Sequence, residues 1–145
     1  AVLEWSMLEL PEAWPRHLLG IGEPEDLFAC VERGIDQFDC VAPTRLARHG
    51  QLYTAAGRLV IQHPEFRDDP LPIEEGCACY TCDQGFSRAY LRHLFVAGEL
   101  LAYTLASLHN LHFVLELMRQ VRRAVHDDRL TDLREQFLAR YRSTA

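Results

Sequence analysis

The chain has 145 residues, of which 48% are apolar and 25% are charged, a composition typical of one globular domain with a buried core. Its net charge of −6 argues against a dedicated nucleic-acid-binding protein, although a local basic cluster can still contact phosphate. No apolar run approaches the roughly 20 residues of a membrane-spanning helix, and the N-terminus has no basic region ahead of an apolar stretch. We therefore expect neither a membrane segment nor a signal peptide.

Short apolar segments alternate with a helical pattern in the first part of the chain. Residues 17–22 (HLLGIG) predict a buried strand that runs into a glycine turn. Pro24 suits a first helical turn, and apolar residues then recur at helical spacing as far as Gly34. Residues 36–41 (DQFDCV) predict a second strand, which ends before Pro43. A strand, a helix and a strand with short connections indicate a βαβ unit with parallel strands.

The middle of the chain predicts a hairpin over residues 51–62, where two β-prone stretches flank Ala55-Ala56-Gly57. The polar, proline-containing segment 63–72 follows. We interpret it as the boundary between two units, residues 1–70 and residues 71–145.

The second unit is predicted to be helical. Its apolar residues recur at steps of three and four, as they do on the buried face of an amphipathic helix. This spacing predicts three helices, over about 86–107, 110–126 and 130–142.

The chain contains five cysteines, and three of them, Cys77, Cys79 and Cys82, lie within six residues. A disulfide framework in a secreted chain would use an even number at wider spacing, so the cluster indicates a metal site in a reducing compartment, and we expect a cytoplasmic protein. Zinc takes four ligands in a tetrahedron, and a closed four-ligand site is structural. The alternative is a group of reduced core cysteines without a metal, which a polar loop disfavours.

Three histidines are candidates for the fourth ligand: His93, His109 and His112. A helix that leaves the cysteine loop at Phe86 and turns back near residue 108 would return His109 to the cysteines. His93 lies two turns into that helix and is expected to point away from the loop. Spacing alone leaves His112 open, because it lies one turn beyond His109.

Asp39 lies near the carboxyl end of the second predicted strand, where barrel enzymes place their catalytic groups. A carboxylate at that position can attack an electrophilic carbon or act as a base. The local sequence alone favours a plainer role, in which Asp39 caps the next turn or pairs with Arg45. Asp36 is expected to be solvated or capping. The following segment, residues 43–50, predicts a loop whose Arg45 and Arg48 suit an anionic substrate such as a phosphodiester, with a solvated loop as the alternative.

Several segments occur in the same order in the bacterial tRNA-guanine transglycosylases, and the chain resembles that family from about residue 15 to residue 142. They are LLGIG, FDCVAPTRLARHG, CACYTC, SRAYLRHL and the pair His109-Asn110. The resemblance implies an α/β fold, namely the C-terminal part of a (β/α)8 TIM barrel with a zinc-binding, mainly helical subdomain. It implies a pentosyltransferase that exchanges the wobble guanine of GUN-anticodon tRNAs for a 7-deazaguanine base, preQ1 or queuine, in queuosine biosynthesis.

The same resemblance implies the roles of the strand-end residues. Asp39 matches the family's nucleophile, which attacks C1′ of the target ribose. Guanine then leaves, and the incoming base displaces the enzyme from a covalent tRNA intermediate, as in retaining glycosidases. Leu19 lies where the family usually has a methionine that packs on the bound base, and leucine keeps the apolar contact. Gly20 and Gly22 would let the backbone approach the substrate.

The resemblance also implies the partners of the chain. Arg45 and Arg48 fall on family positions near the tRNA backbone. One structural zinc ion is implied, with the ligands Cys77, Cys79, Cys82 and His109. One residue is inserted after Cys82 relative to the family pattern. The family forms homodimers through this zinc region, and the aromatic cluster of that interface matches Phe86, Tyr90 and His93.

A (β/α)8 barrel needs about 250 residues, and the resemblance covers only its last two strands. The family's second catalytic aspartate and its glycine-rich base-recognition loop are expected upstream, so the 145-residue chain alone is predicted to be inactive. A different interpretation is a non-catalytic, zinc-stabilised scaffold or dimerisation subunit of a heteromeric transferase. The presence of Asp39 within FDCV favours the enzyme. An archaeosine-type enzyme that acts elsewhere on tRNA is a third, less favoured interpretation.

Overall fold

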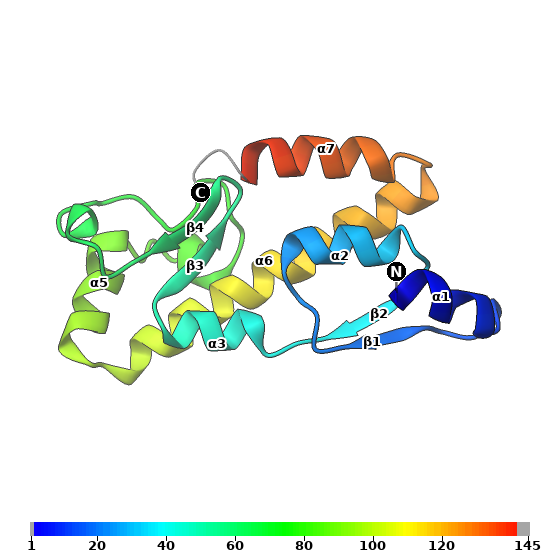
Figure 1. Cartoon of the computed structure of the whole chain (residues 1–145). Helices are drawn as coiled ribbons and strands as arrows, with labels where there is room; N and C mark the ends of the chain where they lie inside the picture. Colours follow the sequence, from blue (N-terminus) through cyan, green and yellow to red (C-terminus); the bar gives the residue numbers. More distant parts are fainter. Residues whose placement is uncertain (1, 142–145) are drawn as a thin grey trace.

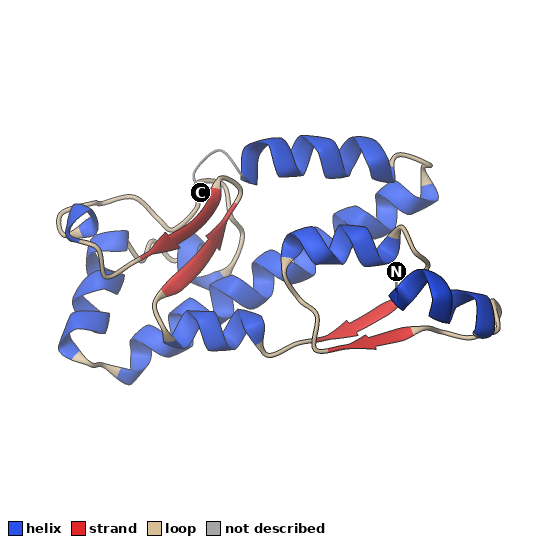
Figure 2. Cartoon of the chain, in the orientation of Figure 1, coloured by secondary structure: helices blue, strands red, loops and turns tan. Residues whose placement is uncertain are grey.

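The computed structural model describes residues 2–141, and the 27-residue helix α6 runs through the middle of the molecule (Figure 1). Two separate two-stranded sheets lie at different points along it (Figure 2). The helices are α1 (Val2–Glu9), α2 (Pro24–Val31), α3 (Ala42–Arg48), the 3-10 helix η1 (Pro64–Phe66), α4 (Tyr80–Asp83), α5 (Arg88–Ala97), α6 (Leu100–His126) and α7 (Leu130–Tyr141). The strands are β1 (His17–Leu19), β2 (Gln37–Asp39), β3 (Gln51–Thr54) and β4 (Gly57–Val60). Within residues 2–141 no helix combines the length and apolar character needed to cross a membrane.

The first sheet confirms the predicted βαβ unit. β1 and β2 pair in parallel, with Leu18 opposite Phe38, and α2 connects them. Pro24 begins α2, and Leu27 and Phe28 on its inner face are almost completely buried. Both strands are shorter than the predicted segments 17–22 and 36–41: β1 ends before Gly20, whose φ is 75°, and β2 ends before Cys40.

One face of the β1–β2 sheet is open and the other is only partly covered, with Phe38 packed against the core cluster that includes Leu27. In both strands the outer two residues are exposed and only the middle one is partly buried. Parallel sheets normally bury both faces under helices. Within the described residues, this sheet is therefore an incomplete layer.

The second sheet is the predicted hairpin. β3 and β4 are antiparallel, and Thr54 pairs with Gly57 across a two-residue turn. Successive side chains of a strand point to opposite faces, so Leu52 and Tyr53 enter different parts of the core. The hairpin thus joins the two halves of the molecule.

The helices after residue 86 differ from the prediction in their boundaries. The segment 86–107 is not one helix, because α5 ends at Ala97. The next residue, Gly98, has a φ of 75°, in the left-handed region that glycine adopts most easily. The predicted break near residues 108–109 does not exist, since α6 continues through it. The last helix matches α7, and residue 142 of its predicted range lies outside the described residues.

The prediction of a loop over residues 43–50 is wrong, because most of this segment forms the helix α3. Pro43 lies in the first turn, where its missing N–H costs no helical hydrogen bond. Ala47 on the inner face is fully buried, and α3 packs against α6. Alanine, leucine and arginine in this segment favour a helix, and tertiary packing on α6 stabilises it further.

Two hydrophobic clusters share α6. The first cluster contains Leu52, Leu91, Leu105 and two of the clustered cysteines. The second contains Leu27, Phe28, Tyr53, Leu117, Val121, Phe137 and Tyr141. The N-terminal half of α6 carries the first and its C-terminal half the second, so this helix fixes the spacing between them.

Candidate functional site

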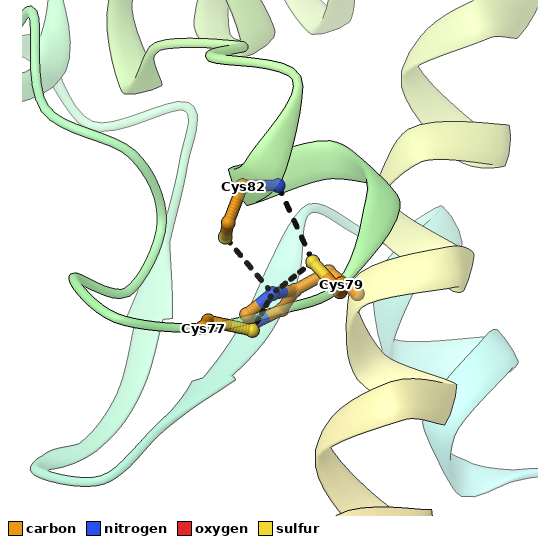
Figure 3. Close-up of side chains that lie close together, drawn as sticks. Cys77, Cys79 and Cys82 are labelled. Carbon is orange, nitrogen blue, oxygen red and sulfur yellow. Dashed lines mark hydrogen bonds between the residues drawn. The ribbon is translucent and has the colours of Figure 1, made fainter.

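The three clustered cysteines and His109 form a metal-binding group. Their donor atoms lie within 4.8 Å of one another, and three of the four residues are buried. Figure 3 shows the side chains of Cys77, Cys79 and Cys82 pointing toward one another. The cysteines come from the loop before α4 and from α4 itself, whereas His109 comes from the middle of α6.

The distances within this group fit a tetrahedral zinc ion. The Nδ1 atom of His109 lies 3.9 Å from the sulfur of Cys77, 3.4 Å from that of Cys79 and 3.6 Å from that of Cys82. Zinc–sulfur and zinc–nitrogen bonds of about 2.3 and 2.0 Å, at tetrahedral angles, place sulfur and nitrogen about 3.5 Å apart. Three sulfurs and one imidazole nitrogen also match the preference of zinc, and four protein ligands leave no open position. The site is of the structural kind.

The other ring nitrogen of His109 determines which tautomer is present. Nε2 lies 2.7 Å from the backbone oxygen of Tyr53, so Nε2–H donates to that oxygen and the Nδ1 lone pair faces the sulfurs. His93 is exposed and His112 is only partly buried, and neither belongs to the group. His109 is thus the fourth ligand, and the expectation that rested on the family resemblance is confirmed.

The protonation of the cluster without a metal also suits a metal site. A hydrogen bond from Cys82 lowers the pKa of Cys79 to about 3 against the opposing effect of burial, with a further contribution from His109. The same bond raises the pKa of Cys82. Burial lowers the pKa of His109, but hydrogen bonds with Cys77 and Cys79 outweigh it and raise that pKa to about 9. Zinc takes thiolate sulfurs and a neutral imidazole nitrogen as ligands, so binding of the metal to this group would release protons.

Local hydrogen bonds shape the cysteine loop. The backbone N–H of Cys82 donates to the sulfur of Cys79 at 3.3 Å, so Cys79 caps α4 at its N-terminus. The hydroxyl of the fully buried Thr81 donates to the backbone oxygen of Leu105 at 2.7 Å. This bond attaches α4 to α6, the helix that supplies His109.

A second candidate site lies at the carboxyl end of the β1–β2 sheet. Leu19 and Asp39 are register partners, so their side chains lie on the same face of the sheet. Leu19 is 73% exposed, and the side chain of Asp39 is 65% exposed. The nearest ionic partner of Asp39 is His17, with Nε2 3.4 Å from a carboxylate oxygen. The plainer expectation was that Asp39 caps the next turn or pairs with Arg45; its ionic partner is instead His17, and none of the described side chains caps the N-terminus of α3.

The glycine loop after β1 lies directly against the end of β2. The backbone N–H of Gly20 donates to the backbone oxygen of Asp39 at 2.9 Å. A Cβ atom on Gly22 would come within 2.5 Å of the Cβ of Cys40, so only glycine fits there. The thiol of Cys40 contacts the oxygen of Gly20 at 3.6 Å and accepts a hydrogen bond from Ala42 N at 3.3 Å. The structure thus brings Leu19, Gly20, Gly22 and Asp39 together.

The remaining predicted residues lie on either side of β2: Asp36 directly precedes it, and Arg45 and Arg48 follow it on α3. The carboxylate of Asp36 accepts a hydrogen bond from the backbone N–H of Arg16 at 2.8 Å, which confirms its expected capping role. Arg45 and Arg48 are exposed on α3, which begins three residues after Asp39. Sequence reasoning missed His17, although it lies two residues before Leu19 and hence on the same face of β1.

Comparison with known proteins gives the family. The family model described as queuine tRNA-ribosyltransferase matches residues 1–143. Queuine tRNA-ribosyltransferases of Desulforudis audaxviator (strain MP104C) and Aquifex aeolicus (strain VF5) are both 51% identical to this chain, over 94% and 92% of it. The enzyme of that name from Staphylococcus aureus (strain JH9) is 50% identical over 91% of it.

The aligned stretches make up 37%, 35% and 35% of these relatives, so the chain spans about a third of the length of the curated relatives it matches. The match covers the cysteine loop, His109 and both strands of the first sheet. The chain belongs to the queuine tRNA-ribosyltransferase family.

Proposed function

We propose that this chain is the nucleophile-bearing and zinc-binding part of a tRNA-guanine transglycosylase. The complete enzyme exchanges the wobble guanine of GUN-anticodon tRNAs for a 7-deazaguanine base, preQ1 or queuine, as a step of queuosine biosynthesis. Family membership supports the general activity. The observation that supports the proposed reaction is that the carboxylate of Asp39, at the end of β2, is exposed.

The β1–β2 sheet suits the last two strands of a (β/α)8 barrel. The strands are parallel, α2 connects them, and the face that carries Leu19 and Asp39 is open. Catalytic groups of such barrels lie at the carboxyl ends of the strands, which is where Leu19 and Asp39 end β1 and β2. The other strands of the barrel would continue the sheet from its edges, and their side chains and loops would enclose the open face.

The proposed reaction uses Asp39 as a nucleophile. A carboxylate oxygen bonds to C1′ of the target ribose while the glycosidic bond to guanine breaks, and guanine departs with the bonding electrons. The incoming base then bonds to C1′ and releases the carboxylate. The glycosidic carbon develops oxocarbenium character, which a nearby carboxylate stabilises and then traps. Asp39 needs an accessible side chain for this role, and it has one.

The residues around Asp39 suit a nucleotide that has left the stacked anticodon loop. The exposed Leu19 side chain offers an apolar surface for a base on the same face as the carboxylate. The space beside Gly20 is open and leaves room for close approach of the backbone, whereas Cys40 occupies the corresponding space at Gly22. Arg45 and Arg48, exposed on α3, suit the phosphates of the tRNA.

The part of the molecule around the cysteine loop, α4 and α5, here called the metal-centred half, suits a dimer interface. Tyr80, Phe86 and Tyr90 form a row of aromatic rings whose centroids lie 6.1 and 5.8 Å apart. Tyr80 is 57% exposed and Tyr90 is 41% exposed, and His93 is exposed on the same helix as Tyr90. Exposed aromatic residues are enriched at protein interfaces. We propose a homodimer through Phe86, Tyr90 and His93, with zinc holding their helix in place.

The proposal is tested by trapping the covalent intermediate in a full-length protein that contains this chain. Incubation with tRNA, followed by denaturation and electrophoresis, should give a protein–tRNA adduct for the natural sequence and none for Asp39→Asn, because the amide is a poor nucleophile. Asp36→Asn is the matched control, since Asp36 is also an exposed carboxylate near β2 but caps a backbone N–H. An adduct that persists in Asp39→Asn would contradict the assignment.

The scaffold interpretation predicts a different outcome, namely no adduct from either protein. The 145-residue chain alone should show no base exchange, because the rest of the barrel is needed to bind and protonate guanine. Base exchange by the isolated chain, measured with radiolabelled guanine, would show that these residues are sufficient.

A further inference from the structure

We propose that Asn110 is a positioning residue that connects the metal centre to the segment carrying Asp39 and to α3. The inference rests on the function proposed above. The side chain of Asn110 belongs to neither site, and its hydrogen bonds go to the backbone of Tyr53, Pro43 and Gln51. It is one of the few polar residues that are completely buried, and all of its side-chain hydrogen bonds reach segments more than 50 residues away in the sequence.

Three hydrogen bonds fix the orientation of the Asn110 amide. Its Oδ1 accepts from the backbone N–H of Tyr53 at 3.0 Å. Its Nδ2 group donates to the backbone oxygens of Pro43 and Gln51, both at 3.0 Å. The two carbonyl oxygens require the NH2 group and the N–H requires the oxygen, so the reversed amide would lose every bond. One side chain therefore holds α3 and β3 together.

The edge of β3 explains why an asparagine is needed. In an antiparallel pair, alternate residues point their backbone groups toward the partner strand and away from it. Thr54 pairs with Gly57 at the turn, which leaves the backbone groups of Gln51 and Tyr53 on the side away from β4. This side faces α6, where water is excluded, so these groups need partners. His109 and Asn110 supply them, and His109 is the zinc ligand.

His109 and Asn110, adjacent residues of α6, thus bind the same backbone segment at Tyr53. His109 binds the metal through Nδ1 and donates from Nε2 to the oxygen of Tyr53, whereas Asn110 accepts from the N–H of the same residue. The metal fixes the position of His109, and His109 and Asn110 together fix both backbone groups of Tyr53. The metal centre therefore determines where β3 lies, and through Asn110 where Pro43 lies.

Pro43 carries this constraint to the strand-end site. It lies in the first turn of α3, four residues after Asp39, and α3 carries Arg45 and Arg48. Between them, the thiol of Cys40 binds the N–H of Ala42 and contacts the glycine loop. A shift of the start of α3 would therefore move the carboxylate, the glycine loop and the two arginines together.

The test compares three variants of a full-length protein that contains this chain. Asn110→Asp keeps the volume and the bond from Tyr53 N–H but loses both donors, and Asn110→Ala loses all three bonds. Thr54→Val is the matched control, because it removes a buried hydrogen bond, to the oxygen of Gly57 at 2.8 Å, from the same hairpin without touching α3. Zinc content, thermal midpoint and the rate of tRNA adduct formation per zinc-loaded subunit are measured for each.

The Asn110 variants are expected to retain zinc and to form the adduct about tenfold more slowly or worse, because a displacement of about 1 Å can cost a hundredfold in rate. Thr54→Val should lower the thermal midpoint and leave the rate within about twofold of the natural protein. Equal rates in all zinc-loaded proteins would overturn the inference. So would an equal loss of rate in Thr54→Val at a similar thermal midpoint, because the effect would then follow stability alone.

A measurement on the natural protein covers the case in which the Asn110 variants do not fold. Hydrogen exchange of the α3 and α4 amides is followed with and without a chelator. Exchange in α3 should increase together with that in α4 when the metal leaves, and α3 amides that stay protected would contradict the inference. Failure of the proposed function is distinguishable, because the natural protein would then form no tRNA adduct at all.

Discussion

The metal-centred half and the β1–β2 sheet differ in how far their large apolar side chains are exposed to solvent. Leu91 and Leu105, beside the cysteine loop, are 0% and 1% exposed. Leu19, on the sheet, is 73% exposed, and Trp5 in the preceding helix α1 is 71% exposed. Parallel sheets in complete proteins are covered on both faces. The first region closes its own core, whereas the second presents surface for other atoms to cover.

This difference separates stability from function. The metal-centred half contains its own stabilising contacts, namely a packed cluster and four converging metal ligands. The sheet contains the carboxylate and glycine loop that we assign to chemistry, and it needs further protein to enclose a substrate. We therefore expect substitutions in the first region to change folding and substitutions in the second to change activity.

Removal of the metal should produce the largest effect. Chelation, or Cys82→Ser, is expected to unfold the cysteine loop and α5, because a structural zinc site contributes on the order of 10 kcal/mol of apparent binding free energy. Far-UV circular dichroism and zinc content measure the loss. Cys30→Ala is the matched control, since Cys30 is a buried cysteine of α2 outside the metal-binding group, and its zinc content should be normal. Unchanged helicity after removal of the metal would show that the site is not structural.

A pair of leucine substitutions sharpens the comparison. Leu91→Ala should lower the free energy of unfolding by about 2–5 kcal/mol, because it leaves a cavity in a fully buried site. Leu19→Ala should change it by less than about 0.5 kcal/mol, because the side chain is mostly exposed. Urea denaturation of the isolated chain measures both. Similar losses for the two would mean that the sheet is covered in solution, for example by self-association.

The smallest expected effect concerns an ion pair between α2 and α7. Arg134 donates from Nη1 to both carboxylate oxygens of Glu32, at 2.6 and 2.7 Å. Glu32→Gln should lower the free energy of unfolding by about 0.5–1 kcal/mol, because the pair is only partly shielded from water. Glu116→Gln, which removes an exposed pair with Arg119 within α6, should leave the urea midpoint unchanged. A larger effect at Glu116 than at Glu32 would contradict this ranking.

The features that the sequence predicted well are those that local chemistry determines. The spacing of Cys77, Cys79 and Cys82 indicated the metal, and the turn at Ala55-Ala56-Gly57 indicated the hairpin. The parallel strands followed from the alternation of strand and helix signals. Spacing alone left His109 and His112 open, because a choice between two ligands one helical turn apart depends on the phase of a helix against a distant loop.

The features that the sequence did not predict depend on contacts between distant segments. Residues 43–50 resembled a polar loop, yet α3 forms because Ala47 packs on α6. Gly98 was included in a continuous helix, because glycine is tolerated within helices and its left-handed φ is visible only in the structure. Asn110 formed part of a recognised sequence pair, but its partners lie 57 to 67 residues away.

The length of α6 gives the metal an influence beyond its own loop. An α-helix of 27 residues extends about 40 Å, and each residue turns it by about 100°. Coordination of His109 fixes the rotation of this rod near its middle. This rotation directs Leu117 and Val121, two to three turns further on, toward the other residues of the second cluster. The insertion of a single residue after His109 would rotate that face away from α2 and α7, so the ion acts as an angular reference for side chains far outside its coordination shell.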